Sequence, residues 1–139
     1  MNVKVKDLMV GSVITSMKHK SVGHARDIMI RNNIKSLPIV NDEHEVEGII
    51  TSTDIMEEVS PHTPISHVMT KNVKTVPLYG DVHIAARVMR NHQINHLVVT
   101  DEKKIVGVLS AFDLLKLVED HRFVMKNAPT PSKKKSGHE

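Results

Sequence analysis

The sequence contains Gly48-Ile-Ile-Thr-Ser-Thr-Asp54 and, 59 residues later, Gly107-Val-Leu-Ser-Ala-Phe-Asp113. Both stretches have the form Gly-x-x-Thr/Ser-x-x-Asp. Upstream of them the likeness continues at a spacing of 60 residues and pairs Val13 with Val73, Val22 with Val82, Ala25 with Ala85, Met29 with Met89, Ile34 with Ile94 and Leu37 with Leu97. The chain is therefore a tandem duplication of one small unit.

Each copy predicts the same succession of elements. A helical turn (6–9 and 65–69) leads into an extended piece (13–15 and 73–76). Ser21 and Asp81 stand as N-caps before helices whose apolar residues have the spacing of a half-buried face. Two β runs around a polar turn predict a hairpin, at 37–40 and 46–50 and again at 97–100 and 105–109. A helix follows each motif, over 53–59 and from 112 to about 125.

The size of the copies predicts how they assemble. Neither copy, at about 60 residues, buries enough surface for secure independent folding. We therefore expect an α/β (α+β) fold in which two β-α-β-β-α repeats, related by a pseudo-twofold axis, pack sheet to sheet. The first repeat would span residues 1–60 and the second residues 65–125, with a proline-stiffened linker at 61–64.

The basic charge of the chain is concentrated at its C-terminus. Residues 126–139 hold four lysines and one glutamate, which accounts for the whole formal net charge of +3. This segment is rich in Pro, Ser and Gly and has almost nothing to bury, so we expect a disordered basic tail. Lys133–Lys135 leave a nucleic-acid-binding hypothesis open, but three adjacent lysines give little electrostatic affinity, and a solubilising tail is favoured.

Composition excludes several classes of protein. The chain has no cysteine, which removes disulfides and thiolate chemistry, and fits a cytoplasmic location. No apolar run is long enough to span a bilayer, and the first residues are too polar for a signal peptide. The ten histidines lack a metal-binding spacing, and no nucleophile or phosphate-loop motif occurs. We expect neither a metal site nor an enzyme.

The repeated motif has the groups that a phosphorylated nucleoside requires. Glycine allows a backbone or a ligand to approach closely. Thr51 and Ser110 lie where a strand enters a helix, and the free N–H groups there favour anions. Asp54 and Asp113, one turn later, can accept hydrogen bonds from a ribose diol. Helix capping alone explains one such motif, but two at matching places favour a ligand site.

Residues 5–120 resemble a pair of cystathionine-β-synthase-type (CBS) domains, also called a Bateman module, here as a standalone CBS domain-containing protein. The resemblance is carried by Lys35-Ser-Leu-Pro-Ile-Val40, Asn95-His-Leu-Val-Val99 and the two motifs. It implies a ligand-sensing regulatory module that binds adenosine nucleotides (AMP, ADP or ATP) or S-adenosylmethionine between its sheets. It also implies a homodimer, an effector protein reached in trans, and no required cofactor beyond the regulatory nucleotide.

The same resemblance implies two clefts, each built from both repeats. The cleft of Asp113 would contain Ser110, Val108, His96, Ser12, Val13, Ile14, Ile34 and Lys35. The cleft of Asp54 would contain Thr51, Ile49, Ser36, Asn72, Val73, Lys74, Ile94 and Asn95. His96 and Ser36 stand at the phosphate positions, where arginine would be the stronger ligand. We therefore favour AMP over polyphosphates, and the cleft of Asp113 over that of Asp54.

One alternative from another class stays open. The chain could be a structural protein that dimerises through its helices and leaves the clefts empty. Apolar residues on the last helix, including Leu114, Leu115, Leu117 and Val118, are consistent with a dimer, although an amphipathic helix must bury one face in any case.

Overall fold

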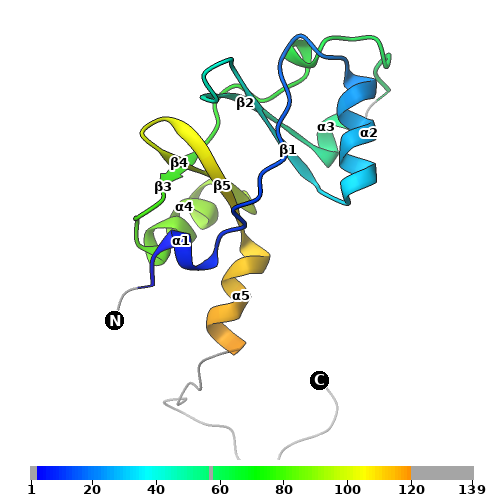
Figure 1. The fold of residues 1–139 in the computed structure, drawn as a ribbon. Coiled ribbons are helices and arrows are strands. Elements are labelled where there is room, and N and C mark those ends of the chain that lie inside the picture. The colour runs from blue at the N-terminus through cyan, green and yellow to red at the C-terminus, as the bar shows by residue number, and fades with distance from the viewer. Residues whose placement is uncertain (1–2, 57, 120–139) are drawn as a thin grey trace, which may run out of the picture.

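The structure is a computed structural model that describes residues 3–56 and 58–119. In chain order its elements are α1 (Val5–Leu8), α2 (Val22–Asn32), β1 (Ser36–Val40), β2 (Val46–Thr51), α3 (Ser52–Met56), the 3-10 helix η1 (Ile65–His67), β3 (Thr75–Pro77), α4 (Val82–His92), β4 (His96–Asp101), β5 (Lys104–Ser110) and α5 (Ala111–Glu119). Figure 1 shows two lobes, with α2, α3, β1 and β2 in one, and α4, α5, β3, β4 and β5 in the other. The expected pair of α/β repeats is confirmed.

The two repeats differ in one strand of their sheets. The second repeat has the order β3-β4-β5, with β3 parallel to β4 and β4 antiparallel to β5. The first has only the antiparallel pair β1-β2, and residues 13–15 form no strand; a single parallel bridge joins Ser16 to Ile39. In the second repeat Val98 N–H donates to the Lys74 carbonyl at 3.3 Å. The matching residue of the first repeat is Pro38, which has no N–H, so this ladder bond cannot form.

The leading segments of the two repeats are exchanged. Val5 and Leu8 of α1 lie in the core of the second lobe with Val82, Met89 and Leu109. Ile65 of η1 lies in the core of the first lobe, with Ala25, Met29, Leu37, Ile39 and Ile50. Backbone hydrogen bonds hold both crossings, from Val5 N to Gly80 O at 2.8 Å and from Ile65 N to Lys20 O at 2.8 Å. Each lobe is therefore completed by the leading segment of the other repeat.

The lobes meet through apolar residues from both sheets. Val40 and Ile49 of the first repeat form a third core cluster with Val98 and Ile105 of the second. The β1–β2 turn adds polar contacts to this interface: Ile105 N–H donates to His44 O at 3.1 Å, and Lys104 Nζ donates to Glu43 O at 2.8 Å. These contacts confirm packing of the two sheets against each other.

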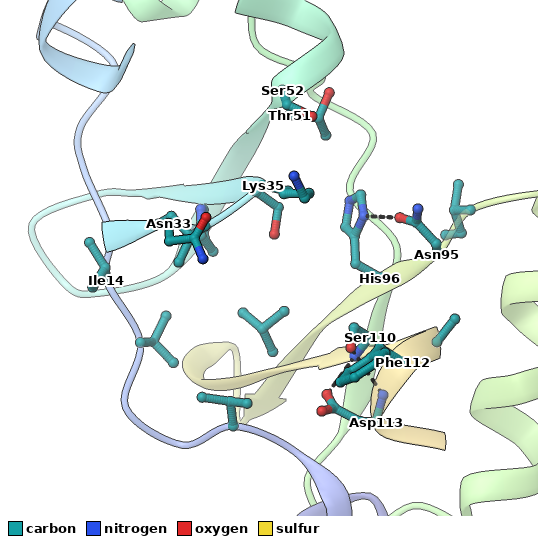
Figure 2. Close-up of a pocket in the computed structure, with 18 of the residues that line it drawn as sticks. Ile14, Asn33, Lys35, Thr51, Ser52, Asn95, His96, Ser110, Phe112 and Asp113 are labelled. Atoms are coloured by element: carbon teal, nitrogen blue, oxygen red, sulfur yellow. Dashed lines mark hydrogen bonds between the residues drawn. The ribbon is translucent and has the colours of Figure 1, made fainter. Parts of the chain in front are cut away.

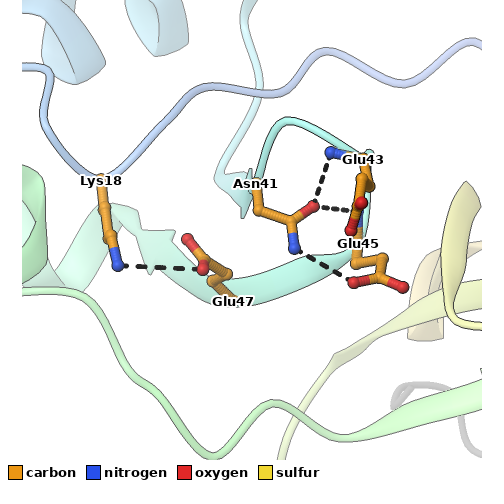
Figure 3. A network of polar contacts seen from close by, with 5 residues as sticks. All are labelled: Lys18, Asn41, Glu43, Glu45 and Glu47. Atoms are coloured by element: carbon orange, nitrogen blue, oxygen red, sulfur yellow. Dashed lines mark hydrogen bonds and ion pairs between the residues drawn. The ribbon is translucent and has the colours of Figure 1, made fainter.

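Asn41 gives the β1–β2 turn its shape. Its Oδ1 accepts hydrogen bonds from the backbone N–H of Glu43 and of Glu45, each at 2.9 Å, and its Nδ2 donates to Glu45 Oε1 at 3.1 Å (Figure 3). Lys18 Nζ approaches Glu47 Oε2 at 3.8 Å beside the same strand. A turn fixed by its own asparagine can present the His44 and Glu43 carbonyls to the second repeat.

The helix ends agree only in part with the sequence predictions. Ser21 caps α2, and its Oγ accepts from His24 N–H at 3.1 Å. Asp81 holds the N-cap position of α4 but makes no side-chain cap bond, because its carboxylate pairs with Lys4 Nζ at 2.6 Å. The helix predicted over 53–59 is shorter, since α3 ends at Met56 and residues 58–60 are not helical. The predicted end of the last helix near residue 125 and the tail at 126–139 lie outside the described residues.

Candidate functional site

A cavity of about 1070 Å³ lies between the two lobes. Both motif turns border it, together with the ends of α2 and α4 and the segment that follows α1 (Figure 2). Its lining residues are Val10, Ser12, Val13, Ile14, Asn33, Ile34, Lys35, Ser36, Pro38, Thr51, Ser52, Thr53, Gln93, Ile94, Asn95, His96, Val108, Ser110, Ala111, Phe112, Asp113 and Leu115. The volume exceeds what one drug-sized ligand requires, and both repeats contribute walls.

Ser110 and Asp113 form a capping box at the start of α5. Asp113 Oδ2 accepts from Ser110 N–H at 2.9 Å, and Asp113 N–H donates to Ser110 Oγ at 3.2 Å. The Asp113 side chain is fixed by these bonds and by burial, with 7% of the residue exposed. The box uses only one carboxylate oxygen, so Oδ1 can still accept hydrogen bonds from a ligand in the cavity. Capping and ligand binding are compatible at this residue.

The first motif shares one bond of this arrangement, in which the aspartate carboxylate accepts from the backbone N–H three residues earlier. Asp54 Oδ2 accepts from Thr51 N–H at 2.8 Å and from Thr51 Oγ1 at 3.1 Å. Thr51 lines the cavity, whereas Asp54 does not. The two motifs therefore face the cavity unequally, with only the second presenting its carboxylate.

His96 begins β4 and is half buried at the wall of the cavity. Its Nδ1 lies 2.9 Å from Asn95 Oδ1. Burial lowers the pKa of His96, because removing the ring from water disfavours the imidazolium, and the negative charge of Asp54 opposes this in part. Burial therefore favours the neutral form of the ring, and the other ionisable side chains of the lining are Lys35 and Asp113.

The predicted site residues are distributed as follows. All nine residues assigned to the cleft of Asp113 line the cavity: Asp113, Ser110, Val108, His96, Ser12, Val13, Ile14, Ile34 and Lys35. Four assigned to the cleft of Asp54 line the same cavity: Thr51, Ser36, Ile94 and Asn95. The other five lie outside its lining: Asp54, Ile49, Asn72, Val73 and Lys74. Ile49 and Val73 instead belong to the core between the lobes.

Several lining residues were not singled out from the sequence. Asn33 and Gln93 end α2 and α4 in the left-handed conformation, at φ of 52° and 55°, and so turn the chain back toward the cavity. Their equivalence by repeat was a usable signal, because each precedes a predicted site residue. Phe112 and Leu115 of α5 also line the cavity, although the position of Phe112 inside the second motif could have indicated it.

The glycines of the two motifs accommodate protein rather than ligand. A Cβ on Gly107 would lie 2.6 Å from Met9 Sδ and 2.8 Å from the Val10 carbonyl oxygen. A Cβ on Gly48 would lie 2.5 Å from Met69 Sδ and 3.1 Å from the Thr70 carbonyl oxygen. The expected close approach exists, and the approaching group is the exchanged segment of the other repeat.

A family model described as the CBS domain matches this chain twice, over residues 5–61 and 65–120. The chain belongs to the CBS domain family. One match falls on each of the duplicated units, so the molecule is a CBS domain pair whose cavity lies between its repeats.

Relatives of this CBS domain pair include much longer proteins. Homoserine O-acetyltransferase of Methanosalsum zhilinae is 36% identical over 123 residues, which cover 87% of this chain and 25% of that protein. L-aspartate semialdehyde sulfurtransferase of Methanocaldococcus jannaschii is 33% identical over 115 residues, or 81% of this chain and 23% of that protein. The chain thus spans about a quarter of the length of these curated relatives.

Two solved structures are similar over nearly their whole length. The CBS domain pair of protein MJ0100, in complex with 5′-methylthioadenosine and S-adenosyl-L-methionine, is 31% identical with a TM-score of 0.79, and the match covers 86% of this chain and 98% of that one. An uncharacterized conserved protein from Pyrococcus horikoshii is 28% identical with a TM-score of 0.77, with 90% and 98% covered.

Two further observations apply to residues 3–56 and 58–119. Among them, no three His, Asp or Glu side chains are grouped as a metal site requires. None of their helices is long and apolar enough to cross a membrane.

Proposed function

We propose that this CBS domain pair is a regulatory module that senses an adenosine-containing ligand of low negative charge. One observation carries the proposal: a single cavity joins an apolar wall to a fixed carboxylate with a free oxygen. Val13, Ile14, Ile34 and Val108 provide the wall for adenine, and Asp113 Oδ1 would accept from the ribose diol.

The charges of the lining support a ligand with few phosphates. Burial disfavours the charged form of His96, and the lining otherwise has one basic side chain, Lys35, and one acidic side chain, Asp113. A triphosphate would bring several negative charges to one lysine, whereas a single anionic group suits it. AMP, favoured by the sequence, meets this condition. S-adenosylmethionine, with its one carboxylate, meets it as well, and 5′-methylthioadenosine brings no negative charge at all. The MJ0100 pair, which was solved with both, gives these two compounds the stronger support.

The regulatory mechanism proposed is a shift between arrangements of the two lobes. Because residues from both repeats line the cavity, a bound ligand favours the arrangement in which both walls contact it. The shift can only be as large as the difference in affinity between arrangements. The interface between the lobes consists of the small cluster around Val40 and Val98 and a few turn contacts, so a change of angle requires little repacking.

A homodimer and an effector protein complete the proposal. Met56 of α3 and Val118 of α5 lie on the final helices of the two repeats and are 80% and 56% exposed. Exposed apolar residues on both final helices support pairing with a second copy through these helices. The effector is a separate protein or a further part of a longer one, as the lengths of the curated relatives suggest.

Isothermal titration calorimetry with S-adenosylmethionine, 5′-methylthioadenosine, AMP, ADP and ATP tests this function. We expect binding of the first three. In thermal unfolding, each of these three should raise the free energy of unfolding by about 2.7 kcal/mol at a concentration 100 times its dissociation constant. Asp113→Ala should abolish binding, while Asp54→Ala, whose carboxylate lies outside the cavity lining, serves as the matched control and should retain it. A dimer that binds none of the five compounds would instead support the structural alternative.

A further inference from the structure

Phe112 is the aromatic residue in the lining of the cavity. It lies within the second motif, between Ser110 and Asp113, and the first repeat has Thr53 at the matching position. Figure 2 shows it at the start of α5, at the edge of the cavity. At this matching position the two motifs therefore offer the cavity different chemistry, an aromatic face from the second repeat and a hydroxyl from the first.

The core does not account for this aromatic ring. On α5 the residues that pack against the second lobe are Leu114 and Leu117. Phe112 is 77% exposed, although a phenylalanine gains most by burial. Tyr79, the other aromatic residue of the described chain, lies elsewhere, with its ring centroid 5.7 Å from Lys6 Nζ. An exposed phenyl ring at the rim of a cavity is available for a ligand.

The ring and the expected ribose position belong to one cavity. Phe112 stands directly before Asp113 at the start of α5, and both residues line the cavity. A ribose held by Asp113 Oδ1, with its base on the wall of Val13 and Val108, has its 5′ substituent within a few bonds of the diol. Phe112 and Leu115 form the rim on this side of α5. A group at the ribose 5′ carbon is therefore within reach of the Phe112 ring.

The group best matched to this ring is a cation without hydrogen-bond donors. The face of an aromatic ring attracts positive charge within about 6 Å of its centroid. The sulfonium of an S-adenosyl compound is such a cation and lies directly on the 5′ carbon. Asp113 adds negative charge on the same side, and Lys35 can pair with the carboxylate of the amino-acid portion.

We propose that Phe112 is a specificity-determining residue that recognises a sulfonium and makes the cavity selective for cationic S-adenosyl ligands over their neutral thioether counterparts. The inference rests on the proposed function, because it assumes that the ribose binds at Asp113. It adds a distinction that the proposed function does not make, between charged and uncharged sulfur on the same adenosine scaffold.

The test compares S-adenosylmethionine with S-adenosylhomocysteine, which differs only in lacking the sulfonium methyl group and its charge. Dissociation constants are measured by calorimetry for the wild type, Phe112→Leu and Phe112→Tyr, with Leu115→Ala as a matched control for the apolar rim. We expect wild type and Phe112→Tyr to prefer the sulfonium compound, and Phe112→Leu to reduce that preference about three- to tenfold, the range of a partly exposed cation–π contact. Leu115→Ala should affect both compounds equally.

If Phe112→Leu weakens both compounds equally, the role of Phe112 is refuted while adenosine sensing stands. If the wild type binds neither compound but binds AMP through Asp113, the role of Phe112 is also refuted and adenosine sensing still stands. If no adenosine compound binds, the proposed function fails with it.

Discussion

Substitution of Gly107 by alanine tests the exchange of segments between the repeats. The added Cβ would meet Met9 Sδ at 2.6 Å and the Val10 carbonyl oxygen at 2.8 Å. The methionine side chain can rotate away, but the carbonyl is held, since Val10 and Val108 exchange two backbone hydrogen bonds of 2.9 and 3.0 Å. The strain must therefore move a backbone segment that also borders the cavity.

Overpacking of this kind costs about 1 to 3 kcal/mol of unfolding free energy. For a chain of this size such a loss lowers the melting temperature by about 4 to 12 °C. Gly48→Ala should cost less, because its backbone neighbour, the Thr70 carbonyl oxygen, is farther away at 3.1 Å. Gly11→Ala is the matched control, since its nearest contact is Met9 Cε at 4.0 Å.

Urea denaturation followed by circular dichroism measures the three variants, and calorimetry then measures ligand affinity for the folded ones. We expect Gly11→Ala to be the most stable variant, Gly48→Ala to be less stable and Gly107→Ala to be the least stable. Ligand affinity should be reduced most in Gly107→Ala, because Val10 and Ser12 line the cavity. A Gly107→Ala protein as stable as Gly11→Ala would refute the packing of the exchanged segment on this glycine.

Three further outcomes are expected. Ser21→Ala should lower the unfolding free energy by about 1 kcal/mol, measured by urea denaturation, because Ser21 Oγ caps α2 at 3.1 Å; an unchanged value contradicts the cap. The pKa of Asp81 is held below its usual value by the hydrogen bond from Lys4. The contact therefore stabilises the fold at pH values above the Asp81 pKa of the unfolded chain, and this stabilisation is lost as the pH falls through the Asp81 pKa of the folded protein. Lys4→Met should raise the Asp81 pKa in a carboxyl NMR titration, and no change would argue against the pair. Burial lowers the pKa of His96, so stability should decrease as pH falls below about 6.5, where the unfolded chain binds the proton first. Asp54→Asn should lower the His96 pKa further in an imidazole NMR titration, and a rise would contradict the charge contact.

Local features of the fold could be predicted where neighbours in sequence decide them. The start of α2 depends on Ser21 and the N–H groups three residues away, and the hairpins depend on β-rich runs around polar turns. The capping box at Ser110 and Asp113 is local as well. Prediction failed where a distant residue competed for the same group. Asp81 would have capped α4 but pairs with Lys4, which is 77 positions away in sequence.

The candidate site shows the same division. Repeat alignment and family resemblance together named nine residues that line one cavity. They did not indicate that Thr51, Ser36, Ile94 and Asn95 line it too, because the resemblance implies two separate clefts. They also did not indicate Phe112, whose exposure depends on which face of α5 packs on the second lobe.

The sequence by itself determined that this protein is a duplicated unit, that each unit carries one Gly-x-x-Thr/Ser-x-x-Asp turn, and that the units must share a core. These follow from periodicity, capping chemistry and the small size of each copy. Only the tertiary structure decided that α1 and η1 change lobes, that the motif glycines make room for Met9 and Met69, and that Asp113 rather than Asp54 faces the cavity. The physical reason is that these depend on contacts between residues far apart in the chain, which periodicity and local hydrogen bonding do not specify.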